Sequence, residues 1–275
     1  MAGDLKPAIT PSCAAVCSTW VWPWVYQQRD ELKTRFERRF GGGATMGVAY
    51  TWSKSISDSS DGIWNDGQGT LRNWYCRSCE RSLTSYDVPH RLVVNYNYEL
   101  PFGKGHKYGA NMNWIANGIL GGWQTNGVFT INSGMPLIFS QTTNNSFSFG
   151  GLQRPDAVGG DARIPVRSID RWFDTSQFRV APNYTFGNIG RVLPDVRGPG
   201  TFNWDLSFIK NTRVHERVNL QFRAEAFNFM NNVNLGIPNG SFSAGPNGKN
   251  NSGTFATITS ARDPRNIQLG LKLLF

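Results

Sequence analysis

From residue 30 onward, apolar and polar residues alternate along several segments, and this period of two constrains the fold more than any other feature. Such a period is typical of β-strands with one apolar and one polar face. The segments approach the roughly nine to eleven residues that a tilted strand needs to cross a bilayer, whereas strands of globular proteins average about five or six. We therefore predict an all-β chain that forms an antiparallel, up-and-down transmembrane β-barrel, here an incomplete segment of about seven strands. The predicted strands cover 30–40, 44–53, 92–99, 123–132, 202–209, 218–227 and 267–275.

The first of these segments has a second interpretation. Leu32, Phe36 and Phe40 are also spaced by four, Asp30 could cap a helix, and Gly41 could end one. We favour a strand, because Gly41, Gly42 and Gly43 would then form a tight hairpin into the next segment.

The lengths of the connections support a membrane barrel. When successive connections are assigned to alternate ends of a sheet, 41–43, 100–121 and 211–217 share one end, whereas the long 54–90, 133–201 and 230–265 share the other. Outer-membrane barrels have short periplasmic turns and long external loops, and compact soluble domains rarely contain several loops of this length. The stretch 100–121 is long for a periplasmic turn. A soluble β-sandwich remains the alternative, since it explains the alternation equally well.

Composition excludes other classes of protein. No run of 18 apolar residues exists, which excludes a transmembrane helix. The net charge is +9, but the basic residues are scattered, so we expect no nucleic-acid partner. Cys13, Cys17, Cys76 and Cys79 include one CxxC pair without a second metal-ligand pair or a thioredoxin-like context, so we expect a loop disulfide or unreactive thiols there.

No arrangement of residues indicates catalysis. His90, His106 and His215 fall at predicted strand ends or turns and do not accompany an acid in a recognisable pattern. The acids between Asp156 and Asp174 match no calcium loop, and a solvated loop is the favoured interpretation. We predict no enzymatic activity, no cofactor and no metal.

Two sets of residues are candidates for barrel functions. An aromatic girdle at the membrane interfaces is predicted from the ends of the apolar faces. Its members are Tyr50, Trp52, Tyr98, Trp123 and Trp204. Charged residues at the strand positions that alternate with the apolar ones are predicted to face the barrel interior. There they would contact water, a plug or a passing ligand, or simply pair across strands. These residues are Lys33, Arg35, Arg39, Asp205, Arg223 and Glu225.

Six motifs, in this order, resemble the C-terminal barrel portion of Oar-like TonB-dependent outer-membrane receptors, of the type with a carboxypeptidase-regulatory-like domain. The resemblance covers about residues 28–275. The motifs are Thr51-Trp52-Ser53-Lys54-Ser55-Ile56, Asp87-Val88-Pro89-His90-Arg91-Leu92 with Tyr98-Glu99-Leu100-Pro101-Phe102-Gly103-Lys104-Gly105, Gly121-Gly122-Trp123-Gln124 with Asn132-Ser133-Gly134-Met135-Pro136-Leu137, Arg197-Gly198-Pro199-Gly200 with Asn203-Trp204-Asp205-Leu206-Ser207 and Lys210-Asn211, Arg223-Ala224-Glu225-Ala226-Phe227-Asn228, and Ser260-Ala261-Arg262-Asp263-Pro264-Arg265 with the terminal Leu273-Leu274-Phe275.

The resemblance implies a location in the bacterial outer membrane and a barrel of about 22 strands around a plug. We expect this chain to be a non-autonomous tail of such a receptor, contributing barrel wall and external loops for binding and uptake of an unknown external ligand. Its implied partners are outer-membrane lipid, the assembly machinery and, only through a plug that is missing here, the TonB complex. A passive porin or a surface adhesin is the alternative function.

The resemblance also implies a C-terminal signal for the outer-membrane assembly machinery. Its residues are Ile267, Leu269, Leu271, Leu273 and Phe275. The alternative is that Phe275 is merely a girdle aromatic. Residues 1–27 differ from the rest and are expected to be an atypical, disordered or misassigned start, or a poor signal peptide.

Overall fold

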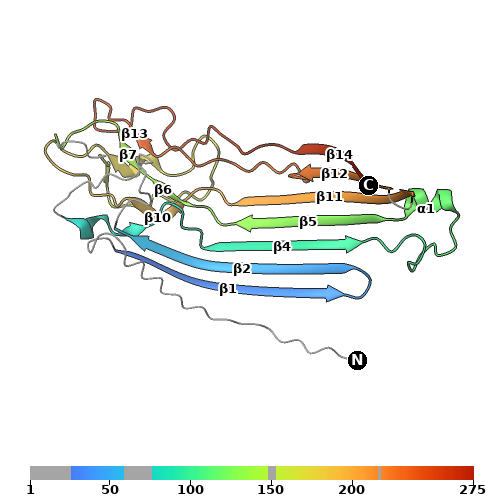
Figure 1. The fold of residues 1–275 in the computed structure, drawn as a ribbon. Coiled ribbons are helices and arrows are strands. Elements are labelled where there is room, and N and C mark those ends of the chain that lie inside the picture. The colour runs from blue at the N-terminus through green and yellow to red at the C-terminus, as the bar shows by residue number, and fades with distance from the viewer. Residues whose placement is uncertain (1–25, 59–75, 148–152, 216–217) are drawn as a thin grey trace.

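The computed structural model describes residues 26–58, 76–147, 153–215 and 218–275. Its main feature is one long antiparallel sheet in which seven strands follow one another in sequence order (Figure 1). These strands are β1 (Gln27–Phe40), β2 (Ala44–Ser57), β4 (His90–Glu99), β5 (Trp123–Asn132), β11 (Thr201–His215), β12 (Val218–Phe227) and β14 (Asn266–Leu274). The predicted number of strands, their order and their antiparallel pairing are confirmed.

The ambiguous first segment is a strand. β1 pairs with β2 along its whole length, from Gln27 opposite Ser57 to Phe40 opposite Ala44. Gly42 and Gly43 adopt positive φ angles of 98° and 81° in the turn between them, a conformation that glycine adopts without a steric penalty.

Several strands are longer than the alternation predicted. β2 continues to Ser57, because its residues 54–57 pair with residues 27–30 of β1, and Ile56 and Ser57 also pair with the short β3 (Ser82–Leu83) of the following loop. β11 continues to His215, so most of the predicted 211–217 connection is strand. β1 begins at Gln27, one residue before the boundary predicted at residue 28. Residues 1–25 lie outside the described part of the chain.

The antiparallel order divides the connections between two ends of the sheet. At the turn end lie 41–43, the β4–β5 connection and the β11–β12 connection, together with the last residue of β14. At the loop end lie the three long connections (Figure 1). The β4–β5 connection carries the helix α1 (Trp114–Leu120). No helix in the described ranges has the length and apolar character required to cross a membrane.

The long loops form an ordered layer with its own core, which the alternation did not predict. We call the described residues of 133–200 and 228–265 the cap. The side chains of Leu137, Phe139, Phe173, Phe178 and Phe242 are completely or almost completely buried there. The remaining short elements of the loop end are η1 (Arg77–Glu80), β6 (Pro136–Ile138), β7 (Ser140–Gln141), β8 (Asp156–Ala157), η2 (Thr175–Gln177), β9 (Phe178–Arg179), β10 (Val192–Arg197) and β13 (Ser241–Phe242).

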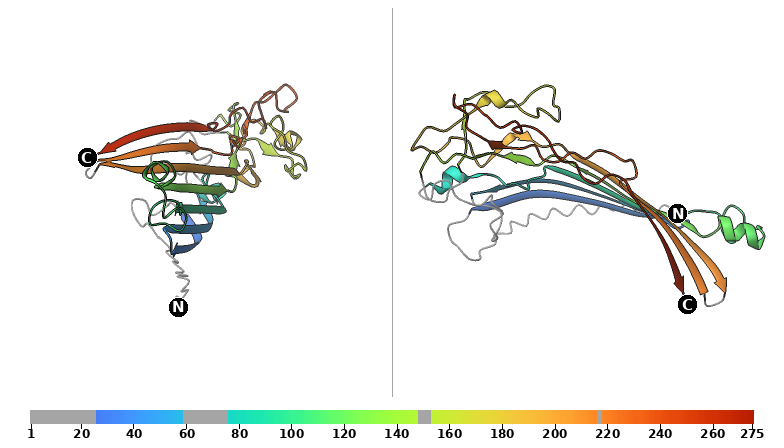
Figure 2. Two further views of the ribbon diagram at one scale, coloured as in Figure 1. Left: turned by 90° about the vertical axis from the view of Figure 1, so that its right-hand side faces the viewer. Right: turned by 90° about the horizontal axis from the view of Figure 1, so that it is seen from above.

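The main sheet is curved and open, and it is not half of a sandwich (Figure 2). In a sandwich, a second sheet would cover one face, but the other sheets among the described residues have only two strands each. β1 and β14 are the two edges, and each pairs with one described strand. The curved wall therefore leaves two rows of backbone hydrogen-bonding groups for further strands.

Candidate functional site

The sheet has one apolar and one polar face, as the alternation requires. The register of all seven strands places apolar residues opposite apolar residues on one face. For example, Val48 is opposite Val94, and Val94 is opposite Phe129. Large apolar side chains on this face are partly exposed to the surroundings. They include Leu32, Phe36, Phe40, Trp52, Ile131, Phe208, Ile267, Leu269, Leu271 and Leu273.

The five predicted girdle aromatics all stand on the apolar face. Tyr98 and Trp123 are near the turn end, whereas Trp52 and Tyr50 are near the loop end, where the Tyr50 hydroxyl lies 2.8 Å from His90 Nδ1. Trp204 is the fourth residue of β11 at the loop end, packs against the Phe229 ring at 5.3 Å, and its Nε1 finds no acceptor among the described residues. Tyr98 and Trp123 mark the turn end and Tyr50, Trp52 and Trp204 the loop end, and the girdle itself remains a prediction.

The predicted assembly-signal residues lie along the edge strand β14. Ile267, Leu269, Leu271 and Leu273 share the apolar face, and Leu271 is 71% exposed. Phe275 follows the last strand residue and is 98% exposed. The geometry leaves the whole row accessible, and its function as a signal remains a prediction.

The six predicted interior charges all stand on the polar face, but their pairing differs from expectation. On β1 the ion pairs run along the strand, with Lys33 Nζ 2.6 Å from Glu31 and Arg35 2.9 Å from Glu37. Cross-strand pairing fails here because the opposing residues are uncharged: Lys33 faces Thr51 and Arg35 faces Ala49. Side chains two residues apart share a face, so long ones reach each other.

The other predicted charges are held by amide groups. Asp205 accepts hydrogen bonds from Asn203 Nδ2 (2.8 Å) and from the Asn228 backbone N–H (2.9 Å), and Arg223 Nε donates to Gln221 Oε1 (2.8 Å). Arg39 and Glu225 stand in the same rows, opposite Thr45 and Ser207.

A cavity of about 390 Å³ lies where the polar face meets the cap. Its walls combine sheet residues such as Arg91 with cap residues such as Met135 and Ile237. A wider hollow of about 790 Å³ continues along the polar face, and the two share Arg91, Asn132, Thr201 and Arg262.

The charge of the cavity comes from arginines. Asp87, the acid in its lining, is buried, and its charge is already paired. Arg197 Nη2 lies 2.7 Å from its carboxylate, and the Ser55 backbone N–H donates to it at 2.8 Å. Arg91 and Arg262 form no ion pair with any residue in the described ranges. An anionic group would therefore find positive charge here.

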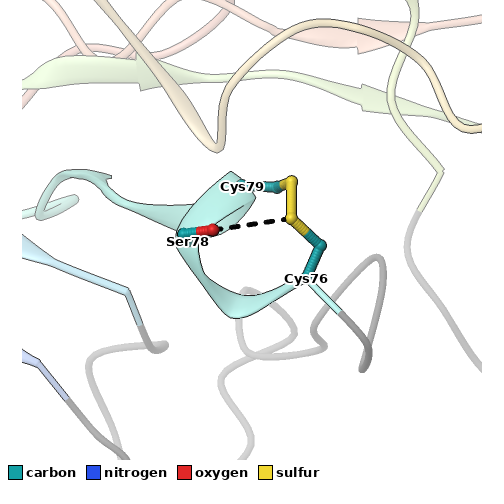
Figure 3. Close-up of a disulfide and its surroundings, with 3 residues drawn as sticks. All are labelled: Cys76, Ser78 and Cys79. Carbon is teal, nitrogen blue, oxygen red and sulfur yellow. Dashed lines mark hydrogen bonds between the residues drawn. A yellow bond between two sulfur atoms is a disulfide. The ribbon is translucent and has the colours of Figure 1, made fainter.

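A second buried ion pair ties the loop after β2 to the cap. Arg154 Nη2 lies 2.5 Å from Glu80 Oε2, and both side chains are at least 96% buried. Glu80 is the last residue of η1. A disulfide joins Cys76, which precedes this helix, to Cys79 within it (Figure 3). The CxxC pair is therefore a loop disulfide. Cys13 and Cys17 lie outside the described residues.

The described histidines weighed as candidates lie at opposite ends of the sheet, with His90 at the start of β4 and His106 in the β4–β5 connection, and the loop acids bond to local partners. Asp156 accepts from the Asn188 backbone N–H at 2.7 Å, Asp161 pairs with Arg163, and Asp174 pairs with Arg171. No group of three or more potential metal ligands occurs among residues with a described position.

The match to known families decides what this wall belongs to. A family model described as "Outer membrane beta barrel domain" matches residues 21–268. The chain belongs to this family. No match was found among curated proteins or among solved structures. As an outer-membrane β-barrel domain, the chain is located in the outer membrane, and the open sheet is part of a barrel wall. The soluble sandwich is thereby excluded.

The cap core and the cavity are the parts of this outer-membrane β-barrel domain that sequence reasoning missed. One signal was present: the loops between predicted strands contain an unusual number of phenylalanines, including Phe139, Phe173, Phe178, Phe242 and Phe255. Solvated loops have no need for so many aromatic side chains.

Proposed function

We propose that this chain is the C-terminal wall and external cap of a TonB-dependent receptor that binds an external ligand and takes it up. The observation that carries the proposal is the cavity between the ordered cap and the polar face. The interior of a porin is a water-filled channel, whereas here an ordered layer of loops forms a cavity together with the polar face, which suits ligand binding. The six motifs that resemble Oar-like receptors, in the same order along the chain, support uptake that depends on TonB rather than passive passage.

In this proposal the loop end faces outside and the turn end faces the periplasm. The apolar face meets lipid, and the polar face, with Lys33, Arg35, Arg39 and Arg223, lines the interior. The plug and the TonB-contacting segment would be supplied by sequence outside this chain.

The cavity favours a ligand that is anionic at one point and apolar elsewhere. Arg91 and Arg262 supply the positive charge, and Met135, Leu235 and Ile237 supply apolar contacts. Serine and threonine hydroxyls from β2 and β11 add neutral hydrogen-bonding groups, namely Thr51, Ser53, Ser55 and Thr201. Pockets of this mixed character orient a ligand through a few polar contacts.

The test is genetic, and it can be carried out before the ligand is identified. Strains that lack this gene, TonB or both are grown on single sources of iron, oligosaccharide or peptide. We expect the two single deletions to fail on the same source and the double deletion to grow no worse than either. A defect that persists independently of TonB would identify a passive porin, and loss of surface attachment without any growth defect would identify an adhesin.

A variant of the cavity then tests the site itself. On the source identified by these strains, Arg91→Gln with Arg262→Gln should reduce uptake while the amount of protein in the outer membrane stays unchanged. Arg223→Gln is the matched control, because Arg223 stands on the same polar face and does not line either hollow. Equal uptake by both variants would contradict the proposed site.

A further inference from the structure

The β4–β5 connection, residues 100–122, is too elaborate for a simple turn. It carries α1, which has no buried residue. Trp114, Ile115 and Ile119 are 78%, 53% and 63% exposed. They share one side of the helix with Gly118, because positions i, i+1, i+4 and i+5 fall within an arc of about 140°. Contiguous exposed apolar residues of this kind are typical of sites that contact protein or membrane.

The position of α1 relative to the two faces of the sheet shows what that partner is. Lys210 Nζ donates to the backbone oxygens of Ile119 (3.0 Å) and Gly121 (2.8 Å). The Trp123 indole N–H donates to the same Ile119 oxygen at 2.9 Å. Lys210 and Trp123 are opposite each other in the β5–β11 pair and stand on the apolar face of the wall. The C-terminal end of α1 is therefore fastened from the lipid side of the barrel and not from its interior.

The rest of the connection suits a layer of phospholipid headgroups. It contains no aspartate or glutamate, and it contains Lys104, His106 and Lys107. Lys107 lies 5.4 Å above the Tyr108 ring, and Tyr108 is itself exposed. Basic and aromatic side chains of this kind are enriched at membrane interfaces, where anionic headgroups attract the lysines.

On the polar side of the helix, the asparagines are used within the loop. Asn113 Oδ1 caps the helix by accepting from the Ala116 N–H at 2.7 Å, and Asn117 Oδ1 accepts from the Lys104 N–H at 2.8 Å. The Asn113 bond closes the first turn of the helix, and the Asn117 bond holds the helix against the loop segment around Lys104. Trp114, Ile115 and Ile119 stay exposed on the other side, and Leu120, which is 49% exposed, adds an apolar side chain beside the asparagines. Figure 1 shows α1 beyond the ends of β4 and β5.

We propose that α1 is an interfacial anchor that inserts Trp114, Ile115 and Ile119 among the phospholipids at the turn end of the barrel. The lipid contact of the sheet continues directly into this helix through Trp123 and Lys210. The proposal rests on the membrane setting of the family and does not depend on uptake or on TonB. It also explains why this connection is longer than a periplasmic turn needs to be.

The experiment places an environment-sensitive fluorophore at Ile115→Cys and, separately, at Ile119→Cys in the complete protein. Cys13→Ser and Cys17→Ser remove competing thiols, and the Cys76–Cys79 disulfide is left oxidised. The protein is reconstituted into vesicles of phosphatidylethanolamine and phosphatidylglycerol, with or without a phospholipid that carries a nitroxide quencher high on its acyl chain. Leu271→Cys is the lipid-facing benchmark, and Glu99→Cys is the matched control at the same end on the polar face.

We expect the probes at positions 115 and 119 to lose emission to the nitroxide as strongly as the probe at 271, while the probe at 99 is unaffected. The proposal is overturned if the probes at 115 and 119 behave like the probe at 99 while 271 is quenched, because the helix then lies in water. It is equally overturned if their emission is blue-shifted but not quenched, because protein then covers the helix. Absence of quenching at 271 would overturn the membrane setting of the sheet and the anchor with it.

Discussion

At the scale of single residues, Gly127 shows how a missing side chain shapes the apolar face. It lies in the middle of β5 and is buried, because the Tyr96 ring of the neighbouring β4 lies over it. A Cβ at this position would lie 2.4 Å from two carbons of that ring. An aromatic side chain that covers a cross-strand glycine compensates for the packing that the glycine lacks.

We therefore expect Gly127→Ala to displace Tyr96 and to lower the yield of folded protein. The measurement is the fraction that keeps the compact, heat-sensitive mobility of a folded barrel on gel electrophoresis. Gly270→Ala is the control, since its Cβ would meet its nearest neighbour at an ordinary 3.9 Å. If both variants fold equally well, the contact between Gly127 and Tyr96 does not contribute to folding.

Asp174 gives a residue-scale prediction for pH. The pKa of its carboxyl group is lowered to about 2, chiefly by the hydrogen bond from the Gln177 side chain, with further bonds from Ser176 and Arg171. Since the ordinary pKa of the group is 3.8, its contribution to stability is complete above about pH 4. The contribution is lost as the pH falls from about 4 to about 2.

Proteolysis of the cap at a series of acid pH values would measure this effect. Cleavage near η2 should increase below about pH 4 in the parent protein. Asp174→Asn should show a smaller change over that interval. An unchanged acid response in Asp174→Asn would assign the response to other carboxylates.

At the scale of elements, the cap is a folding unit built from segments that are far apart in the chain. The Phe139 ring stacks on Phe178 at 4.8 Å and meets Phe173 edge-on at 5.2 Å, and Phe255 from the last loop closes the cluster. Because this core is separate from the sheet, its loss should loosen the cap and leave the wall intact.

Phe178→Ala tests this separation. Removing a buried phenylalanine costs about 3–5 kcal/mol. We expect rapid proteolysis within 133–200, while the heat-sensitive mobility of the folded barrel is retained. Phe186→Ala, at an exposed position in the same loop, should change neither property. Unfolding of the wall together with the cap in Phe178→Ala would show that the two parts form one cooperative unit.

At the scale of the whole molecule, the decisive feature is a seven-stranded wall with two open edges. Lipid cannot satisfy the backbone groups along β1 and β14, so these edges must pair with further strands in the membrane. One of these edges, β14, also carries the predicted assembly signal. The apolar side chains of this strand are exposed while its outer edge has no partner strand among the described residues.

Deletion of Phe275 tests the signal. We expect the full-length protein without Phe275 to accumulate in the periplasm and to be depleted from the outer membrane, as measured by fractionation. Leu274→Ala is the control, because Leu274 is on the opposite face of the same strand. Normal assembly without Phe275 would identify this residue as an interfacial aromatic only.

The sequence by itself determined the wall of this protein. A period of two is a local property, so it identifies each strand and its two faces independently of the neighbouring strands, and alternate connections then define the two ends. For residues 30–40 the alternation and the following Gly41–Gly43 favoured a strand, and the pairing of β1 with β2 decided against the helix that the same residues allowed. The positions of Lys33 and Arg223 on the polar face followed from parity alone.

Only the tertiary structure decided what lies above the wall and beside it. Asp87 and Arg197 are 110 residues apart, and Glu80 and Arg154 are 74 apart, so no pattern within either segment predicts their pairing. The same holds for the aromatic core of the cap and for the attachment of α1 through Lys210. These contacts depend on how distant loops approach one another in space, whereas the strands depend on alternation within a few neighbouring residues.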